Sequence, residues 1–204
     1  MVHRTLTVVS AGIGTPSSTR VLAGEIADAT LLALRAAGAT VDARHVELRD
    51  LAHAIADATL AGFPSGALRD ALADVARADA LVVAAPTYQA SYSGLFKSFF
   101  DLVDAGSLRG VPVVLAATGG TERHSLVIES ALRPLFAHLG ATTVPTGVYA
   151  ATSDFGGEGA AALAERVERA AHELATLLEG GSLRPARARD LVPFTDLLDR
   201  VEPR

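Results

Sequence analysis

Residues 80–97 read Ala80-Leu81-Val82-Val83-Ala84-Ala85-Pro86-Thr87-Tyr88-Gln89-Ala90-Ser91-Tyr92-Ser93-Gly94-Leu95-Phe96-Lys97. The apolar run 81–85 is typical of a buried strand, and residues 94–103 have the character of a helix. Between the two lies a loop with two of the three tyrosines of a chain that has no tryptophan. An open α/β sheet binds its ligand at such a loop, at the carboxyl end of a strand. Proline, small polar residues and aromatic rings suit a flat heterocycle, which needs a stacking surface and little bulk.

Strand-like and helix-like segments alternate along the rest of the chain. Their apolar patterns predict strands at 6–10, 41–48, 81–85, 111–117 and 142–149, and helices at 21–37, 67–77, 94–103, 125–139 and 158–178, with 51–63 ambiguous. Central strands that are apolar throughout indicate a parallel sheet covered on both faces. We therefore expect an α/β fold, a flavodoxin-like three-layer sandwich with a five-stranded parallel sheet of order 2-1-3-4-5. Residues 1–180 are expected to form this domain, and residues 181–204 a C-terminal extension.

The composition excludes several classes of protein. The net charge of −5 and the lack of a long basic run argue against binding to nucleic acid. The absence of cysteine excludes disulfides, thiolate catalysis and cysteine-bound metal, and the six histidines show no metal-ligand spacing. No apolar run approaches the roughly 18 residues of a membrane helix, and no signal-peptide pattern precedes the first strand. A cytoplasmic protein without a metal site or a membrane segment is expected.

The loop after the first strand has the character of an anion site. Residues 10–20 read Ser-Ala-Gly-Ile-Gly-Thr-Pro-Ser-Ser-Thr-Arg and lead into a helix, whose first N–H groups attract negative charge. Arg20 could add a charge-assisted contact. The loop lacks the Gly-Lys-Ser/Thr ending of a P-loop and the third glycine of the dinucleotide fingerprint, so it suits a monophosphate. The alternative is that Ser17 or Ser18 only caps the helix and Arg20 is solvated.

The loop after the fourth predicted strand contains adjacent glycines. Residues 118–125 read Thr-Gly-Gly-Thr-Glu-Arg-His-Ser, and glycines allow a backbone to approach a ligand closely. The alternative is a turn that only needs positive φ. Because the loops after strands one, three and four meet at the carboxyl edge of the predicted sheet, together they predict a mononucleotide site with a large, flat base.

The three motifs together resemble the NAD(P)H-dependent FMN reductases, and more narrowly the actinobacterial-type branch of that family. The resemblance is carried by Ser-Ala-Gly…Pro-Ser-Ser-Thr-Arg at 10–20, by the run from Pro86 to Asp101, and by Ala-Thr-Gly-Gly at 117–120, and it covers about residues 5 to 178. The second motif holds the complete Pro-x-Tyr/Phe…Ser…Gly-x-Leu/Phe-Lys pattern of the family. The first departs from the commoner Gly-Ser-x-Arg form.

The resemblance implies where the cofactor would bind. The residues that would hold the FMN phosphate are Ser10, Ser17, Ser18, Thr19 and Arg20. The residues that would line or complete the isoalloxazine loop are Pro86, Thr87, Tyr88, Gln89, Ser91 and Tyr92. The residues that would run along the other side of the ring are Thr118, Gly119 and Gly120.

The activity that the resemblance implies is hydride transfer from NADPH or NADH to flavin N5, with no catalytic side chain and no metal. In one version of this hypothesis, the reduced FMN passes to a flavin-dependent monooxygenase. Family members are dimers or tetramers, and the apolar residues on more than one face of 94–103 fit a homo-oligomer. Arg123 could favour the 2′-phosphate of NADPH by its charge, and the alternative is an ordinary surface arginine.

Other functions stay open at this point. One alternative is an NAD(P)H:quinone or azo-type reductase with bound FMN. Another is a flavodoxin-like electron carrier without enzymatic activity, which the net charge of only −5 and the presence of Arg20 disfavour. The last alternative is a scaffold protein that binds no flavin.

Overall fold

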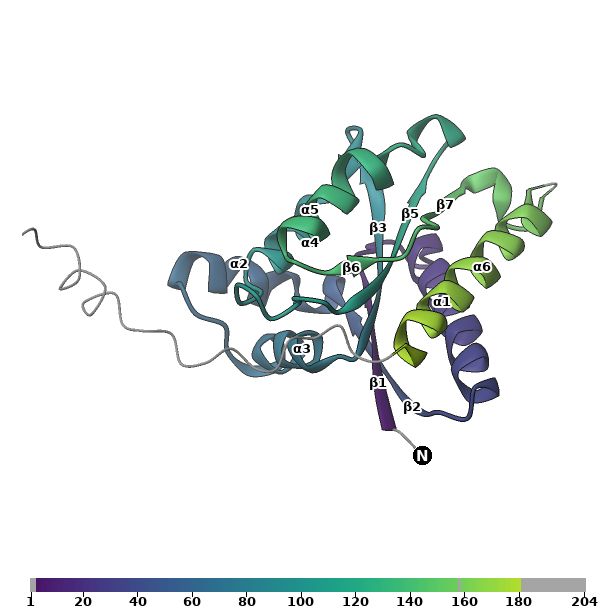
Figure 1. Cartoon of the computed structure of the whole chain (residues 1–204). Helices are drawn as coiled ribbons and strands as arrows, with labels where there is room; N and C mark the ends of the chain where they lie inside the picture. Colours follow the sequence, from purple (N-terminus) through teal and green to yellow (C-terminus); the bar gives the residue numbers. More distant parts are fainter. Residues whose placement is uncertain (1–2, 158, 181–204) are drawn as a thin grey trace, which may run out of the picture.

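The computed structural model describes residues 3–157 and 159–180 and has three layers (Figure 1). The strands are β1 (His3–Ser10), β2 (Thr40–Glu47), β3 (Ala80–Tyr88), β4 (Ser91–Tyr92), β5 (Pro112–Gly119), β6 (Thr142–Thr143) and β7 (Val148–Ala151). The α-helices are α1 (Ser18–Ala36), α2 (Ala52–Ala61), α3 (Gly66–Arg77), α4 (Gly94–Phe100), α5 (Arg133–His138) and α6 (Ala160–Glu179). Short 3-10 turns lie at Leu48–Leu51, Glu122–His124 and Thr152–Asp154, and a π-helical turn at Ile128–Leu132. The expected extension at 181–204 lies outside the described residues.

The sheet has the predicted parallel order. β2, β1, β3 and β5 pair in that sequence, and β6 and β7 both pair with β5 on its outer side. The order 2-1-3-4-5 and the flavodoxin-like class are therefore confirmed, but within the described residues the sheet has seven strands where five were expected. The single strand expected at 142–149 is interrupted between β6 and β7, where Pro145 has no N–H to donate. Gly147 also lies close to the π-helical turn that precedes α5, and an added Cβ there would be 2.6 Å from Cγ2 of Ile128.

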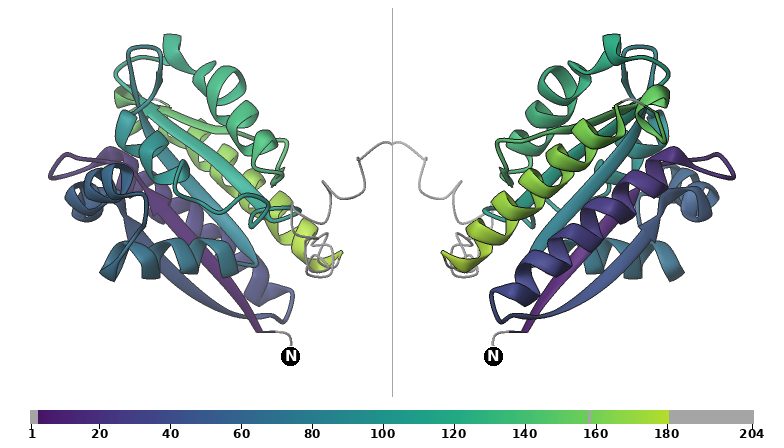
Figure 2. Two further views of the ribbon diagram at one scale, coloured as in Figure 1. Left: turned by 90° about the vertical axis from the view of Figure 1, so that its left-hand side faces the viewer. Right: turned by 90° about the vertical axis from the view of Figure 1, so that its right-hand side faces the viewer.

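The sheet is covered on both faces, as the apolar strands predict. Figure 1 shows α1 and α6 on one side of the sheet and α2, α3, α4 and α5 on the other. The right-hand view of Figure 2 looks onto α1 and α6, which lie side by side. Side chains of β3 alternate between the two layers, since Leu81 and Val83 belong to the core under α4 while Val82 and Ala84 belong to the core under α1. This arrangement leaves the carboxyl ends of the strands free to carry loops.

The segment after β3 is a hairpin, where the sequence predicts a loop. β3 continues to Tyr88 and pairs antiparallel with β4, and the turn consists of Gln89 and Ala90 at φ of 48° and 63°. Two-residue hairpin turns of this kind favour Asn-Gly. Because this turn is Gln-Ala, the sequence carries no signal for it. Ser93 then caps α4 by accepting the N–H of Phe96 at 3.3 Å.

The aromatic residues of α4 pack inside the chain. Phe96, Phe99 and Phe100 are fully buried, and the ring of Phe100 lies 4.6 Å from that of Phe96 and 5.0 Å from that of Phe136 on α5. The helix also ends at Phe100, earlier than the predicted 103. These phenylalanines therefore stabilise the core and do not supply a surface for a second subunit.

Arg133 connects α5 to the segment that follows β6. Its guanidinium donates to the carboxylate of Glu129 at 2.6 and 2.8 Å and to Oγ1 of Thr143 at 2.7 Å. It also donates to the carbonyl oxygens of Val144 and Pro145 at 3.0 and 3.1 Å. The planar fork of arginine suits this set of acceptors, which lysine could not match.

Replacing Arg133 with alanine is expected to lower the free energy of unfolding by about 1–2 kcal/mol, because the carbonyl oxygens lose charge-assisted partners. Chemical denaturation measures this, and Arg133→Lys should recover only part of the loss. The hydrogen bond from Arg133 lowers the pKa of Glu129. The share of stability from this pair is thus present above the ordinary glutamate pKa and is lost as the pH falls through the lowered one. An unchanged unfolding midpoint in Arg133→Ala would contradict this role.

Candidate functional site

The loops after β1, β3 and β5 meet at the carboxyl edge of the sheet and enclose a pocket of about 270 Å³. This is the convergence that the sequence predicts. The predicted site residues that line it are Ser17, Ser18, Thr19, Pro86, Thr87, Tyr88, Thr118, Gly119 and Gly120. The predicted residues that do not line it are Ser10, Arg20, Gln89, Ser91 and Tyr92.

One end of the pocket is the N-terminus of α1. Ser17 is the N-cap, and its Oγ accepts the N–H of Arg20 at 3.2 Å. The N–H groups of Ser18 and Thr19, in the first turn, have no partner within the helix. α1 has 19 residues, so the partial positive charge of its dipole adds to these donors. The arrangement suits a phosphate, and it also shows that the cap proposed as the alternative is present.

Buried hydroxyls connect this end of the pocket to β5. Oγ1 of Thr19 and Oγ1 of Thr118 lie 2.7 Å apart, and both residues are buried. Ser10, also buried, accepts the N–H of Gly12 through its Oγ at 3.4 Å. Ser10 and the Thr19–Thr118 pair therefore hold the loop and the start of α1 in place.

Gly12 is a point of close approach. A Cβ at this position would lie 1.9 Å from Oγ of Ser17 and 3.1 Å from Cβ of Thr19. Glycine is thus required so that the loop can pass next to the cap of α1.

Arg20 lies on the other side of the same loop. It lines a neighbouring hollow with Arg49, and its Nε is 3.4 Å from the carboxylate of Glu47. Arg49 donates to the carbonyl oxygen of Gly14 at 3.2 Å and to the hydroxyl of Thr15. Arg49 therefore supports the loop from outside, and it is a contributor that the sequence did not indicate.

The β3–β4 hairpin forms the second wall. Tyr88 is 47% exposed, so its ring is available for stacking. Oγ1 of Thr87 is buried and makes no hydrogen bond within the described residues, although it lies near enough to the Tyr149 hydroxyl to influence its pKa. Tyr92 instead packs on Phe96, with ring centroids 5.6 Å apart, and Gln89 forms the exposed turn.

The third wall is the pair Gly119 and Gly120, whose roles differ. A Cβ on Gly119 would lie 2.2 Å from the hydroxyl oxygen of Tyr149, so a protein side chain already occupies that space. A Cβ on Gly120 would meet nothing within 4 Å. Gly120 is therefore the glycine of the pair that leaves room for a ligand.

Several lining residues were not singled out from the sequence. They are Gly12, Ile13, Gly14, Pro16 and Thr152. The first four belong to the loop at 10–20, so their inclusion follows from its position. Thr152 follows β7, and the rule that loops at the carboxyl edge converge would have indicated it.

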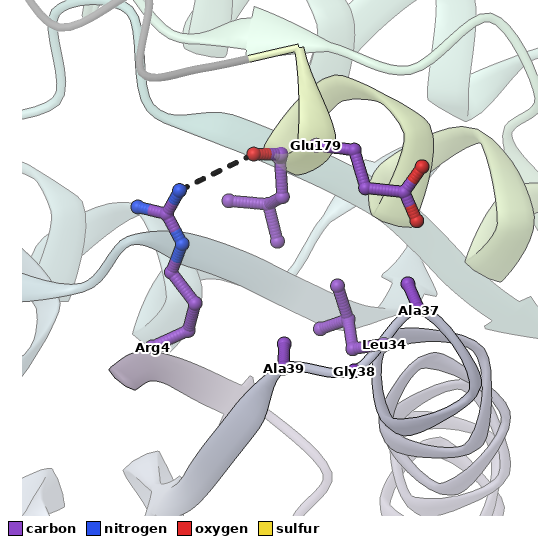
Figure 3. A pocket seen from close by; sticks show the side chains of 7 residues that line it. Arg4, Leu34, Ala37, Gly38, Ala39 and Glu179 are labelled. Carbon is purple, nitrogen blue, oxygen red and sulfur yellow. Dashed lines mark hydrogen bonds between the residues drawn. The ribbon is translucent and has the colours of Figure 1, made fainter. Parts of the chain in front are cut away.

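A further hollow lies at the opposite edge of the sheet, between the start of β1 and the ends of α1 and α6 (Figure 3). There the guanidinium of Arg4 donates to the carbonyl oxygen of Leu178 at 3.3 Å and lies 3.5 Å from the carboxylate of Asp79. The lining of this hollow comes from the start of β1 and from the C-terminal ends of α1 and α6, where the helix dipole disfavours an anion, and it includes the acidic side chain of Glu179. The three-loop pocket is accordingly the better candidate for a nucleotide.

The groups present fit a mononucleotide with a flat ring. Unpaired N–H groups at a helix start suit a phosphate, while an exposed tyrosine, an unpartnered threonine hydroxyl and an open glycine suit a polar, planar ring. Among the described residues, no group of three or more histidines, aspartates or glutamates could hold a metal ion. No helix in the described ranges is long and apolar enough to span a membrane.

Comparison with known proteins agrees with this fit. The family model for NADPH-dependent FMN reductase matches residues 5–156. NADH-dependent FMN reductase SfnF of Pseudomonas putida is 45% identical over 148 residues, which are 72% of this chain and 77% of that protein. An FMN reductase (NADPH) of Pseudomonas aeruginosa is 46% identical over 148 residues, 72% of this chain and 76% of that one. The X-ray structure of an oxidoreductase from Corynebacterium diphtheriae is 45% identical, covers 88% of this chain and 99% of its own, and has a TM-score of 0.85. The chain therefore belongs to the NADPH-dependent FMN reductase family.

Proposed function

We propose that this chain is an NAD(P)H-dependent FMN reductase that binds its flavin in the three-loop pocket. The observation that carries the proposal is the meeting of three different elements in one hollow: the free N-terminus of α1, the hairpin with Tyr88, and the open glycine Gly120. Each suits a different part of FMN. Membership of the family supports the same ligand.

The α1 end of the pocket would hold the phosphate. The N–H groups of Ser18 and Thr19 and the hydroxyl of Ser18 would donate to its oxygens. Arg20 is 71% exposed, so its side chain is free to turn from Glu47 toward a bound anion. Neighbouring Arg49 holds the loop through its contacts with Gly14 and Thr15.

The hairpin and the loop after β5 would hold the ring. Thr87 would offer its hydroxyl and Tyr88 its aromatic face, while Gly120 would leave space along the opposite side. When bound, FMN supplies the acceptor for a hydride from the nicotinamide nucleotide. Because hydride transfer itself requires no proton transfer, no side chain needs to act as an acid or base. The protein contributes orientation and exclusion of water.

The proposal includes both nicotinamide nucleotides as donors. Two relatives of nearly equal identity are named for different ones, SfnF for NADH and the Pseudomonas aeruginosa enzyme for NADPH. Arg123 lies in the exposed turn after Gly120, where its charge would favour the additional phosphate of NADPH. We further propose that the chain forms a homodimer or homotetramer in the cytoplasm. It would deliver reduced FMN to a flavin-dependent monooxygenase.

Steady-state kinetics tests the activity. The purified chain is given NADH or NADPH with and without FMN, and we expect nucleotide oxidation that depends on added or bound FMN. Oxidation that requires a quinone or azo dye would favour the second enzymatic alternative, and a bound flavin that only a partner reductase reduces would favour the carrier. Absence of nucleotide oxidation with every acceptor would contradict the proposal.

A further inference from the structure

Tyr149, at the end of the sheet, holds the loop that forms the third wall of the pocket. It lies in β7, its side chain is buried, and its hydroxyl donates to the carbonyl oxygen of Thr121 at 2.7 Å. Thr121 directly follows Gly119 and Gly120, which line the pocket. Tyr149 itself does not line it. Tyr149 therefore acts on a bound ligand only indirectly, through neighbours that do line the pocket: this loop and Thr87, whose hydroxyl lies near the hydroxyl of Tyr149.

The loop is shaped to accept the tyrosine. A Cβ on Gly119 would be 2.2 Å from the hydroxyl oxygen of Tyr149 and 3.3 Å from its Cζ, whereas the distance to Cβ of Thr87 would be an ordinary 3.6 Å. Gly119 has no positive φ, so conformation does not explain the glycine. The close approach of Tyr149 explains it, which changes the sequence-based interpretation that both glycines serve the ligand.

The tyrosine hydroxyl stays a donor at neutral pH. Burial raises its pKa above the usual value, and the carboxylates of Asp154 and Glu122 act in the same direction, while the hydroxyl of Thr87 acts against them. A protonated hydroxyl can keep its hydrogen bond to Thr121 throughout the range in which the enzyme is expected to work.

We propose that Tyr149 is a positioning residue for the flavin: by filling the space beside Gly119 and binding the Thr121 carbonyl, it fixes Gly119 and Gly120 where they line the pocket. The inference rests on the proposed function for its ligand. The contact between Tyr149 and Gly119 is a property of the chain alone, so the two can be tested separately.

The first test removes only the hydroxyl. Tyr149→Phe is expected to weaken FMN binding about fivefold, the equivalent of one hydrogen bond, and to raise KM for FMN while kcat at saturating FMN stays within about twofold. Thr7→Val is the matched control, because it removes a buried hydroxyl that donates to the carbonyl oxygen of Asp74 at 3.1 Å, in the middle of β1. Both variants should lower Tm by a few degrees, and only Tyr149→Phe should change FMN affinity.

The second test is a double-mutant cycle on stability. Gly119→Ala is expected to lower Tm strongly, or to reduce the yield of folded protein, because its Cβ collides with the tyrosine hydroxyl. The double variant with Tyr149→Phe should regain part of that loss, since the atom at 2.2 Å is gone and the next is at 3.3 Å. A merely additive result would show that Tyr149 does not dictate the glycine and would overturn the inference.

The outcomes separate the two proposals. Unchanged FMN affinity in Tyr149→Phe, with the Tm loss of the Thr7→Val control, would overturn the positioning role and leave the proposed function intact. A wild-type chain that binds no FMN would overturn the proposed function and the positioning role together. The stability cycle would then still measure the contact between Tyr149 and Gly119.

Discussion

Replacing Gly120 with leucine is expected to leave the fold intact and to weaken FMN binding at least tenfold. Gly120 lines the three-loop pocket, and a Cβ there would meet nothing within 4 Å. Its backbone does not need positive φ, so a larger residue can adopt it without strain. The four carbons of a leucine side chain would then occupy space that the ligand needs, which costs contacts with the ring and forces it to move.

Equilibrium titration with FMN, followed by quenching of flavin fluorescence, measures this effect, and a thermal melt checks the fold. Gly24→Leu is the matched control, since a Cβ added at Gly24 would also meet nothing within 4 Å. Gly24 lies within α1 and does not line the pocket. The control should bind FMN like the wild type. Equal FMN affinity in Gly120→Leu and the control would mean that the ligand does not lie against Gly120.

Replacing Gly12 with alanine is expected to impair both stability and FMN binding. The added Cβ would be 1.9 Å from Oγ of Ser17, so the serine must rotate and release the N–H of Arg20. Loss of an N-cap costs about 1 kcal/mol, and the 3.1 Å approach to Thr19 displaces the helix start that would bind the phosphate. We expect FMN affinity to fall at least tenfold and Tm to fall by several degrees.

Ser17→Ala separates the two contributions of this variant, because it removes the cap and leaves Gly12 in place. It should lose a similar share of stability but less FMN affinity than Gly12→Ala. If Gly12→Ala bound FMN as tightly as the wild type, the start of α1 could not be the phosphate site.

The regular part of the fold could be predicted because local patterns determine it. The apolar run 81–85 is too hydrophobic for an exposed strand, and the apolar spacing of 21–37 suits only a helix with one buried face. Because loops after neighbouring parallel strands meet at the carboxyl edge of the sheet, the strand order then predicted that the three loops lie together. The hairpin at Gln89 and Ala90 could not be predicted, because neither residue is typical of a turn with positive φ.

The limits of prediction at the site have a different origin. Thr87 and Gly120 could be found from the loops that carry them, whereas Tyr149 could not, since its role depends on an approach between β7 and the loop after β5. Arg20 has the right charge and the right position in the sequence, yet its side chain lies beside Glu47 on the far side of the loop. Contacts of this kind are set by packing between elements and leave no local pattern.

Hydrogen–deuterium exchange with and without saturating FMN locates the ligand on the whole chain at once. If FMN binds in the three-loop pocket, backbone amides in 10–20, 86–93 and 118–121 should exchange more slowly, because the ligand covers them or accepts their hydrogen bonds. The hollow at the other edge, between Arg4 and the end of α6, should show no change. Protection confined to that hollow, or no protection in the three loops while FMN is bound, would contradict the assignment of the site.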